Sequence, residues 1–362
     1  EIHRYASGEL TNGIVQIGVG IFTRAHQAWY LHRLMQMGKA HDWAILGAGV
    51  RPYDAEMRTK LLAQDCLTTL VELDPASDGL EVTGSMIGYL PIEPNNAALI
   101  AQMADPAVRI VSLTVTEGGY YQDARGALDL THADIQHDIA QPQAPVTAFG
   151  AILAALNLRR SAGHAAFTVL SCDNLQGNGD IVRSVVLGLA QASDPALADW
   201  IAGEGAFPNS MVDCIVPATA PALVHDLSAQ GVADAAPVSH EAFRQWVIED
   251  SFCNGRPLWE DVGATLTSDV HAYEAMKLRI LNGGHQLLAN AGELLSVETI
   301  AGCMQDPDIS AFFERVQIRE ILPYVQSVPG TSTDDYLALV QRRIANPKIH
   351  DTTRRGAFDG SS

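Results

Sequence analysis

Four polar residues within a span of twelve, Glu274, Lys277, Asn282 and His285, form the densest cluster of chemically capable side chains in the sequence. Glu274 and Lys277 lie three residues apart, as do Asn282 and His285, so each pair shares one face of a helix. Apolar residues accompany them at helical spacing, at Leu278, Leu281 and Leu288. We therefore predict a helix that packs in the interior or along a cleft. The alternative is a solvated helix whose polar side chains are satisfied by water and backbone.

Lys277 is the member of this cluster that could act as a general base. A lysine that is partly desolvated in a cleft loses its preference for the charged form, so its pKa falls from roughly 10.4 towards neutrality. On a regular helix, however, Lys277 and Asn282 are about 140° apart. Either the flexible lysine stem or the Gly283-Gly284 pair must therefore bring the two groups around one small substrate.

A second chemical signal is the glycine turn that follows the first apolar run, residues 14–19. The first glycine of a G-x-G turn permits a tight bend, the second lets backbone approach a pyrophosphate, and the following helix offers free N–H groups. The third glycine of the usual fingerprint is replaced by Thr23, which we expect to push the helix slightly off the strand. We predict that the turn contacts a dinucleotide through Gly18, Gly20, Ile21, Phe22 and Thr23. The alternative is a strand-to-helix turn that uses glycine for backbone freedom alone.

The second strand should end near an acidic residue that accepts the ribose hydroxyls of NAD. In this sequence the first acidic residue after it is Asp54, whereas Arg51 lies closer. Arg51 could face the 2′-phosphate of NADP, or it could be an ordinary exposed arginine. The choice between the two cofactors therefore stays open at this point.

Short apolar runs alternate with helical patterns over the first two-thirds of the chain, which is typical of α/β proteins with a parallel sheet. The expected strands are residues 14–19, 43–48, 108–116 and 166–171, and the expected helices between them are residues 25–37, 147–160 and 180–192. After residue 268 the pattern becomes helical, over residues 271–295, 309–316 and 334–344. We predict a Rossmann-type doubly wound sheet in residues 1–268 and a mostly α-helical domain in residues 269–362.

Composition excludes several other classes of protein. The 362 residues are 47% hydrophobic and carry 23 basic against 42 acidic side chains, a net charge of −19, which disfavours nucleic acid and anionic membranes as partners. The sequence shows no apolar run long enough to span a membrane. Its five scattered cysteines lack C-x-x-C spacing, which argues against a disulfide scaffold or a zinc site and favours the cytoplasm.

Two other dehydrogenase classes fit the sequence poorly. Tyr273 and Lys277 spell the Y-x-x-x-K pair of short-chain dehydrogenases, but here some 250 residues of α/β sequence separate that pair from the glycine turn. Zinc-dependent alcohol dehydrogenases need a Cys/His cluster with ligand spacing, which this sequence does not show.

Five blocks of the sequence together resemble the polyol-specific long-chain dehydrogenase family. They are Gly18-Val-Gly-Ile-Phe-Thr-Arg-Ala-His26, Thr114-Val-Thr-Glu-Gly-Gly-Tyr120, Ser171-Cys-Asp-Asn174, Phe207-Pro-Asn-Ser-Met-Val-Asp213 and Lys277-x₄-Asn282-x₂-His285. The blocks span most of the chain in the family's order, and the last of them is the specific one.

The resemblance implies a metal-free, zinc-independent oxidoreductase that uses NAD, with NADP possible. Lys277 would take the hydroxyl proton as hydride leaves the adjacent carbon, and Asn174 and Asn282 would donate hydrogen bonds to the developing alkoxide. His285 and Asp213 would contact substrate hydroxyls.

The remaining predicted site residues have less specific support. Glu274 would relay the proton to water or form a simple helix salt bridge. Glu117, in the second block, and Arg51 are further predicted cofactor contacts. Arg355 begins a family pattern, R-x-x-x-D-G-S-x-K, of which the sequence ends one residue before the expected lysine, so we expect the second domain to be C-terminally incomplete.

The leading hypothesis is therefore reversible oxidation of a polyol, such as mannitol, another hexitol or arabinitol, to its ketose. One alternative is reduction of an acidic keto-sugar such as fructuronate, which needs an extra cation for the substrate carboxylate, and Arg355 is the candidate. A second alternative is a dinucleotide-binding protein without catalysis. The sequence predicts neither the preferred polyol nor the oligomeric state.

Overall fold

A five-stranded parallel sheet forms the centre of the first part of the chain. The computed structural model of the protein describes residues 9–76 and 79–359, with Asp359 described only in its backbone. The sheet order is β5-β2-β1-β6-β7, and each neighbouring pair is parallel. The strands are β1 (Asn12–Ile17), β2 (Ala44–Ala48), β5 (Met86–Tyr89), β6 (Ile110–Leu113) and β7 (Thr168–Ser171). Four of them match the predicted strands, whereas β5 at the sheet edge was not predicted.

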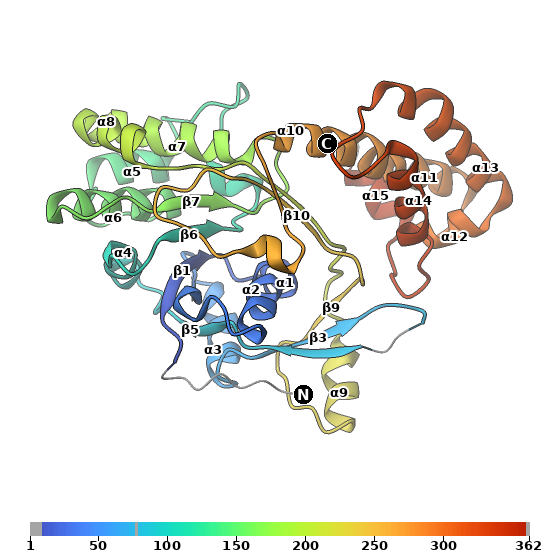
Figure 1. Ribbon diagram of the computed structural model, residues 1–362, viewed down its shortest axis with the longest axis horizontal. Helices are drawn as coiled ribbons and strands as arrows, with labels where there is room; N and C mark the ends of the chain where they lie inside the picture. Colours follow the sequence, from blue (N-terminus) through green and yellow to red (C-terminus); the bar gives the residue numbers. More distant parts are fainter. Residues whose placement is uncertain (1–8, 77–78, 360–362) are drawn as a thin grey trace.

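Helices cover both faces of this sheet (Figure 1). Alternate residues of one strand point to opposite faces, so Val15 and Ile17 pack with one group of helices and Ile14 with the other. The first group is α4 (Ala97–Ala104), α5 (Ala133–Ala140), α6 (Ala148–Ala162), α7 (Asn178–Ser193) and α8 (Pro195–Glu204). The second is α1 (Ile21–Ala25), α2 (Gln27–Gln36) and α3 (Asp54–Leu62). This arrangement confirms the predicted doubly wound α/β fold.

The strand order places a crevice at the carboxyl ends of β1 and β6. From β1 the chain proceeds outward through β2 to β5 on one side, and then returns to β6 and β7 on the other. Where the strand order reverses in this way, the loops that follow the two central strands diverge and leave room for a ligand. The residues that follow these strands are Gly18 and Thr114, so the glycine turn lies at the expected position.

Two small sheets extend the first part and were not predicted. One has the order β4-β3-β9 and the other β11-β10-β8, in which β10 is antiparallel to β8 and parallel to β11. Their strands are β3 (Thr68–Glu72), β4 (Leu80–Thr83), β8 (Ser210–Asp213), β9 (Val238–His240), β10 (Gln245–Glu249) and β11 (Thr265–Thr267). These runs have only three to five residues, and β9 pairs with β3 far away in the sequence, so local patterns do not reveal them.

The residues after β11 that the structure describes form helices and turns, as expected. Here the predicted long helix is α10 (Val270–Met276), a π-helical turn η4 (Lys277–Asn282) and α11 (Gly283–Leu295). The others are α12 (Ile300–Gln305), α13 (Pro307–Val316), the π-turn η5 (Gln317–Ile321), the 3₁₀ turn η6 (Leu322–Tyr324), α14 (Thr333–Ile344) and α15 (Thr353–Asp359). The last residues of the Arg355 pattern, 360–362, lie outside the described residues.

Minor elements complete the chain. They are the 3₁₀ turns η1 (His41–Trp43), η2 (Glu117–Tyr120) and η3 (Trp259–Val262), and the helix α9 (Pro221–Ala229). Met211 of β8 and Val247 of β10 belong to the same buried core as Tyr273 and Leu281, so the second small sheet joins the helical region to the rest. Among the described residues, no helix is both long and apolar enough to cross a bilayer.

Candidate active site

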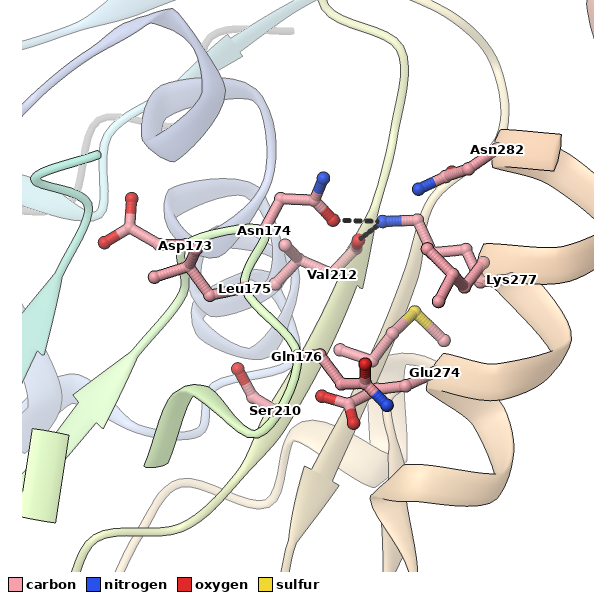
Figure 2. Close-up of a pocket in the computed structure, with 11 residues that line it drawn as sticks. Asp173, Asn174, Leu175, Gln176, Ser210, Val212, Glu274, Lys277 and Asn282 are labelled. Carbon is pink, nitrogen blue, oxygen red and sulfur yellow. Dashed lines mark hydrogen bonds between the residues drawn. The ribbon is translucent and has the colours of Figure 1, made fainter. Parts of the chain in front are cut away.

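The π-turn η4 determines how the polar cluster is presented. In a π-helix the backbone hydrogen bonds join residue i to residue i+5, so the side chains of Lys277 and Asn282 come close to one face. Both side chains line the same cavity, and Figure 2 shows Asn282 directed towards the lysine amino group. The backbone itself therefore reduces the angular separation expected on a regular helix.

The same turn corrects one detail of the predicted apolar stripe. Leu281 and Leu288 are buried as predicted, but Leu278 is 49% exposed. The prediction assumed a regular period of 3.6 residues through this segment, and the wider turn breaks that period. Leu278 consequently faces outward beside the cavity rather than into the core.

A neighbouring helix segment supports the π-turn from behind. Gln317, which begins the second π-turn, is fully buried and donates a hydrogen bond from Nε2 to the Ile280 carbonyl at 2.9 Å. Gly284 permits this contact, because a Cβ at that position would lie 2.7 Å from Gln317 Nε2 and 2.9 Å from the Phe313 ring. Gly284 thus serves close packing behind the site.

Lys277 is buried, with 8% of its surface exposed, and its amino group has two acceptors. Nζ donates to Asn174 Oδ1 at 2.7 Å and to the Val212 carbonyl at 2.8 Å (Figure 2). Asn174 follows β7, and Val212 lies in β8, so the lysine reaches from the helical region across to two strands. Burial lowers the pKa of Lys277, and the positive charge of Arg343 lowers it further, against the opposing effects of Asp213 and Glu274.

Asp213, the last residue of β8, lies beside this lysine and lines the larger cavity next to it. Its carboxylate accepts two hydrogen bonds from Arg343, at 2.7 and 2.8 Å. Burial alone would raise the pKa of Asp213, but the adjacent guanidinium holds it below its usual value. Arg343 also binds Glu241, at 2.7 and 2.9 Å. Neither Arg343 nor Glu241 was predicted from the sequence.

Glu274 has partners other than Lys277. Its Oε1 accepts a hydrogen bond from the Gly177 amide at 3.0 Å, and its Oε2 pairs with Nδ1 of His271 at 2.9 Å. Glu274 and Lys277 line one small cavity, and His271 is 56% exposed at the protein surface. The salt bridge considered for Glu274 therefore joins it to His271, and that pair connects the cavity with solvent.

His285 and Arg355 are not among the described residues that line the two cavities beside Lys277. His285, near the start of α11, is a quarter exposed, and its Nε2 is 3.8 Å from Asp351. Burial lowers the pKa of His285, and the charges of Arg343 and Arg355 lower it further. Arg355 is exposed on α15, and its positive charge is close enough to act on the pKa of His285.

The glycine turn has the geometry that its sequence predicts. Gly18 has a φ of +83°, and a Cβ there would lie 2.1 Å from the Thr114 carbonyl. A Cβ on Gly20 would meet no protein atom within 4 Å, so it would enter open space instead. Thr23 is accommodated because its hydroxyl hydrogen-bonds to Thr114 Oγ1 at 2.8 Å and lies 3.4 Å from the Gly18 carbonyl. The side chain thus ties the helix to the neighbouring strand end.

Two cavities meet at this turn. Both include Gly20, Thr114 and Thr116 among their lining residues. One extends over Val50, Arg51, Tyr53 and Asp54, and the other extends over Ile21, Phe22, Cys172, Asn174, Asp213 and Lys277. A dinucleotide laid across Gly20 would therefore place one end near Arg51 and the other near Lys277, which fits the predicted cofactor.

The residues around Arg51 fit NAD better than NADP. Arg51 donates to the Tyr121 hydroxyl at 2.6 Å and lies 3.6 Å from Asp134, so its charge is already engaged. Asp54 folds back over Gly49 and accepts hydrogen bonds from the amides of Val50 and Arg51 through Oδ2. An acidic group thus does lie at the end of the second strand, although it comes from the first turn of α3.

A buried aspartate, Asp173, fixes the segment after β6 that lines the cofactor cavity. Asp173 accepts hydrogen bonds from the amides of Val115 and Thr116, both at 3.0 Å, and from the Tyr120 hydroxyl at 2.6 Å. Thr116 has a φ of +64°, which is strained for a β-branched residue. Glu117 follows it on η2, is exposed, and is absent from the described lining of either cavity.

Fold and site together define a Rossmann-type dehydrogenase whose polar cluster comes from a separate helical region. The mannitol dehydrogenase Rossmann domain profile matches residues 12–261, and the mannitol dehydrogenase C-terminal domain profile matches residues 269–362. The chain belongs to the mannitol dehydrogenase family, which confirms the resemblance predicted from the sequence.

Several relatives are similar over nearly the whole chain. A mannitol 2-dehydrogenase from Cereibacter sphaeroides is 57% identical over 99% of this chain and 75% of its own length. A polyol:NADP oxidoreductase from Gluconobacter oxydans is 40% identical over 97% of this chain and 73% of its own. The chain spans about three quarters of the length of these two relatives.

Two solved structures share the architecture. The Pseudomonas fluorescens mannitol 2-dehydrogenase, in ternary complex with NAD and D-mannitol, is 43% identical with a TM-score of 0.90, covering 97% of this chain and 72% of that one. A D-sorbitol dehydrogenase in substrate-free form is 38% identical with a TM-score of 0.93, covering 98% of this chain and 74% of that one.

The two glycines of the turn make a matched pair for testing the cofactor cavity. Gly18→Ala should lower the free energy of unfolding by about 2 kcal/mol or more, because it combines a left-handed backbone with overpacking. Gly20→Ala should keep wild-type stability in urea unfolding and yet weaken NADH binding, measured by fluorescence titration. Wild-type NADH affinity in Gly20→Ala would show that the dinucleotide does not cross this turn.

Support of the π-turn by Gln317 is tested by Gln317→Leu. The change removes the donor to the buried Ile280 carbonyl, which costs about 1–3 kcal/mol, and it should lower kcat while NADH affinity stays unchanged. Ile318→Ala, at a half-exposed neighbour on the same turn, is the control. An unchanged kcat in Gln317→Leu would mean that the turn keeps its form without this hydrogen bond.

Proposed function

We propose that the protein catalyses the reversible, NAD-dependent and zinc-independent oxidation of a polyol, such as mannitol or a related hexitol or pentitol, to the ketose. The observation that carries the proposal is the buried amino group of Lys277, held by two acceptors at the wall of the cavity that begins at the glycine turn. Residues 1–268 are proposed as the dinucleotide-binding domain and residues 269–362 as the catalytic domain. The predicted cytoplasmic location is kept as part of the proposal.

Lys277 acts as the general base in this proposal. A neutral amine has two N–H bonds and one lone pair, and Asn174 Oδ1 and the Val212 carbonyl are placed to accept both N–H bonds. The lone pair is then left for a substrate hydroxyl in the cavity, and burial favours this uncharged form. In the reverse direction the protonated amine returns the proton to the ketose oxygen.

The two asparagines stabilise the charge that develops on the substrate oxygen. Because Oδ1 of Asn174 faces the lysine, its NH₂ group remains free to donate to that oxygen. Asn282 presents its amide from the opposite side, on the last residue of the π-turn (Figure 2). Two preorganised donors at a developing alkoxide lower the barrier without any reorganisation during the reaction.

Other residues bind the substrate and move the proton. Asp213 and His285 are proposed to hold hydroxyls further along the polyol, with Arg355 at the outer rim. The proton leaves Lys277 through the small cavity towards Glu274, and His271 passes it to solvent. The bound nicotinamide supplies the hydride acceptor, and the residues proposed to hold the dinucleotide are Gly18, Gly20, Ile21, Phe22, Thr23, Asp54, Arg51 and Glu117.

NAD is proposed as the cofactor because Asp54 keeps its Oδ1 for a ribose hydroxyl while Arg51 is paired with Tyr121 and Asp134. A carboxylate at this position repels a 2′-phosphate. Among the described residues, no group of three or more His, Cys, Asp or Glu side chains could hold a metal ion. The proposed chemistry accordingly assigns proton transfer and charge stabilisation to side chains.

Reduction of a keto-sugar acid is the weaker candidate function. It needs a cation for the substrate carboxylate, and Arg343, the guanidinium beside Asp213, is already bound to two carboxylates. Arg355, which is exposed on α15, is the other candidate. The cavity wall formed by Asp213 is better suited to uncharged hydroxyl groups.

Replacement of Lys277 tests the base. Lys277→Met should reduce turnover by roughly 10²- to 10⁴-fold, the usual contribution of a general base, and leave NADH binding intact. Lys60→Met, at a partly exposed lysine on α3, is the control. In the wild type, kcat/KM for oxidation should rise with pH and level off above a pKa below 10.5, because the uncharged amine is the active form. An unchanged rate in Lys277→Met would contradict the mechanism.

A substrate and cofactor panel tests the class of reaction. NADH absorbance is followed with mannitol, sorbitol and arabinitol in turn, each with NAD and with NADP. We expect turnover with at least one polyol, and faster turnover with NAD. Faster turnover with NADP would assign a different role to Arg51 and Asp54, and greater activity on fructuronate than on fructose would favour the sugar-acid reaction.

A further inference from the structure

We propose that Arg343 is a positioning residue for the reaction: it fixes the Asp213 carboxylate at the substrate cavity and is itself fixed by Glu241. The inference rests on the proposed function, because Asp213 contacts substrate only if a polyol occupies that cavity. Neither Arg343 nor Glu241 lines the cavity among the described residues. Both therefore act through Asp213 rather than on the substrate.

The geometry of the three side chains supports this role. Nη1 and Nη2 of Arg343 bind the two oxygens of Asp213, while Nε and Nη2 bind the two oxygens of Glu241. All three side chains are at most 6% exposed. A planar guanidinium that forms bidentate pairs with two carboxylates leaves each carboxylate one orientation.

Each member of the triad comes from a different element. Arg343 lies in the last turn of α14, Asp213 ends β8, and Glu241 follows β9. Glu241 is tied to the chain beyond β8 as well, because its Oε1 accepts a hydrogen bond from the Ile215 amide and its own amide donates to the Ile215 carbonyl. The end of β8 is thus held on both sides of Asp213.

Arg343 lies on the buried face of its helix and is not a surface arginine. Its helix buries a stripe at Tyr336, Leu337, Val340 and Ile344, and Arg343 falls on that stripe. Its guanidinium also stacks on the Phe243 ring at 4.1 Å. A charge on the buried face of a helix persists only when it is paired, and here the pairing partner is a wall of the substrate cavity.

The orientation of Asp213 has a chemical consequence. A carboxylate offers about four lone-pair positions, and Arg343 takes one on each oxygen. The remaining positions accept hydrogen bonds from hydroxyl groups. Fixed in this way, Asp213 selects a substrate with hydroxyls at the matching carbons and disfavours one with a carboxylate there.

The test is a double-mutant cycle on the polyol KM. Arg343→Lys keeps the charge but loses the bidentate pairing, so it should raise KM about tenfold with a smaller change in kcat. Asp213→Asn should raise KM roughly 10- to 100-fold, the effect of losing a hydrogen bond to a charged group. Because Arg343 acts through Asp213, the double variant should resemble Asp213→Asn alone, within about threefold.

Controls separate positioning from a structural role. Arg342→Lys, at the exposed neighbour on the same helix, should match the wild type, and NADH affinity should be unchanged in every variant. Additive effects in the double variant, or a lower melting temperature and kcat with unchanged KM in Arg343→Lys, would overturn the inference. No wild-type turnover of any polyol would overturn the proposed function and this inference together, whereas wild-type turnover with additive effects would overturn this inference alone.

Discussion

The arrangement of the site depends on the burial of one amino group. Lys277 reaches from the helical region to Asn174 and to the Val212 carbonyl, so its hydrogen bonds join three segments that are distant in sequence. An amine in this environment must keep both acceptors, because an unpaired buried polar group is costly. The sheet order, the loop after β7, the end of β8 and the π-turn all have to be in place before those two bonds can form.

The end of β8 is where the two parts of the chain depend on each other most. Val212 is bound by Lys277, and the next residue, Asp213, is bound by Arg343, so two consecutive residues of one strand are held by two different helical segments. The glycine turn lies on the other side of the same cavity. One wall of the cavity therefore comes from the parallel sheet and the other from the helices. Polar groups on each wall find their hydrogen-bond partners on the other.

Much of this could be predicted from local patterns, and the failures have identifiable physical causes. Four strands of the central sheet, the glycine turn and the lysine cluster could be predicted from the spacing of apolar residues and from residue type. The small sheets could not be predicted in this way, because their strands are short and a strand such as β9 is stabilised by β3, far away in the sequence. Arg343 was not predicted, and the signal of its burial in the sequence is its position on the apolar stripe of α14. The π-turn could not be predicted, because the sequence of residues 277–282 is equally compatible with a regular helix.

That π-turn has a further consequence for how the sequence can change. One turn closed by i-to-i+5 bonding takes up one residue more than a regular turn. Substitutions within residues 277–282 alter single side chains, but deletion of one residue would let the backbone relax to an ordinary helix. The helix that follows would keep its place, because the turn had absorbed the extra residue, but the five-residue spacing that presents Lys277 and Asn282 to one cavity would be lost. The length of this segment is thus as constrained as its composition.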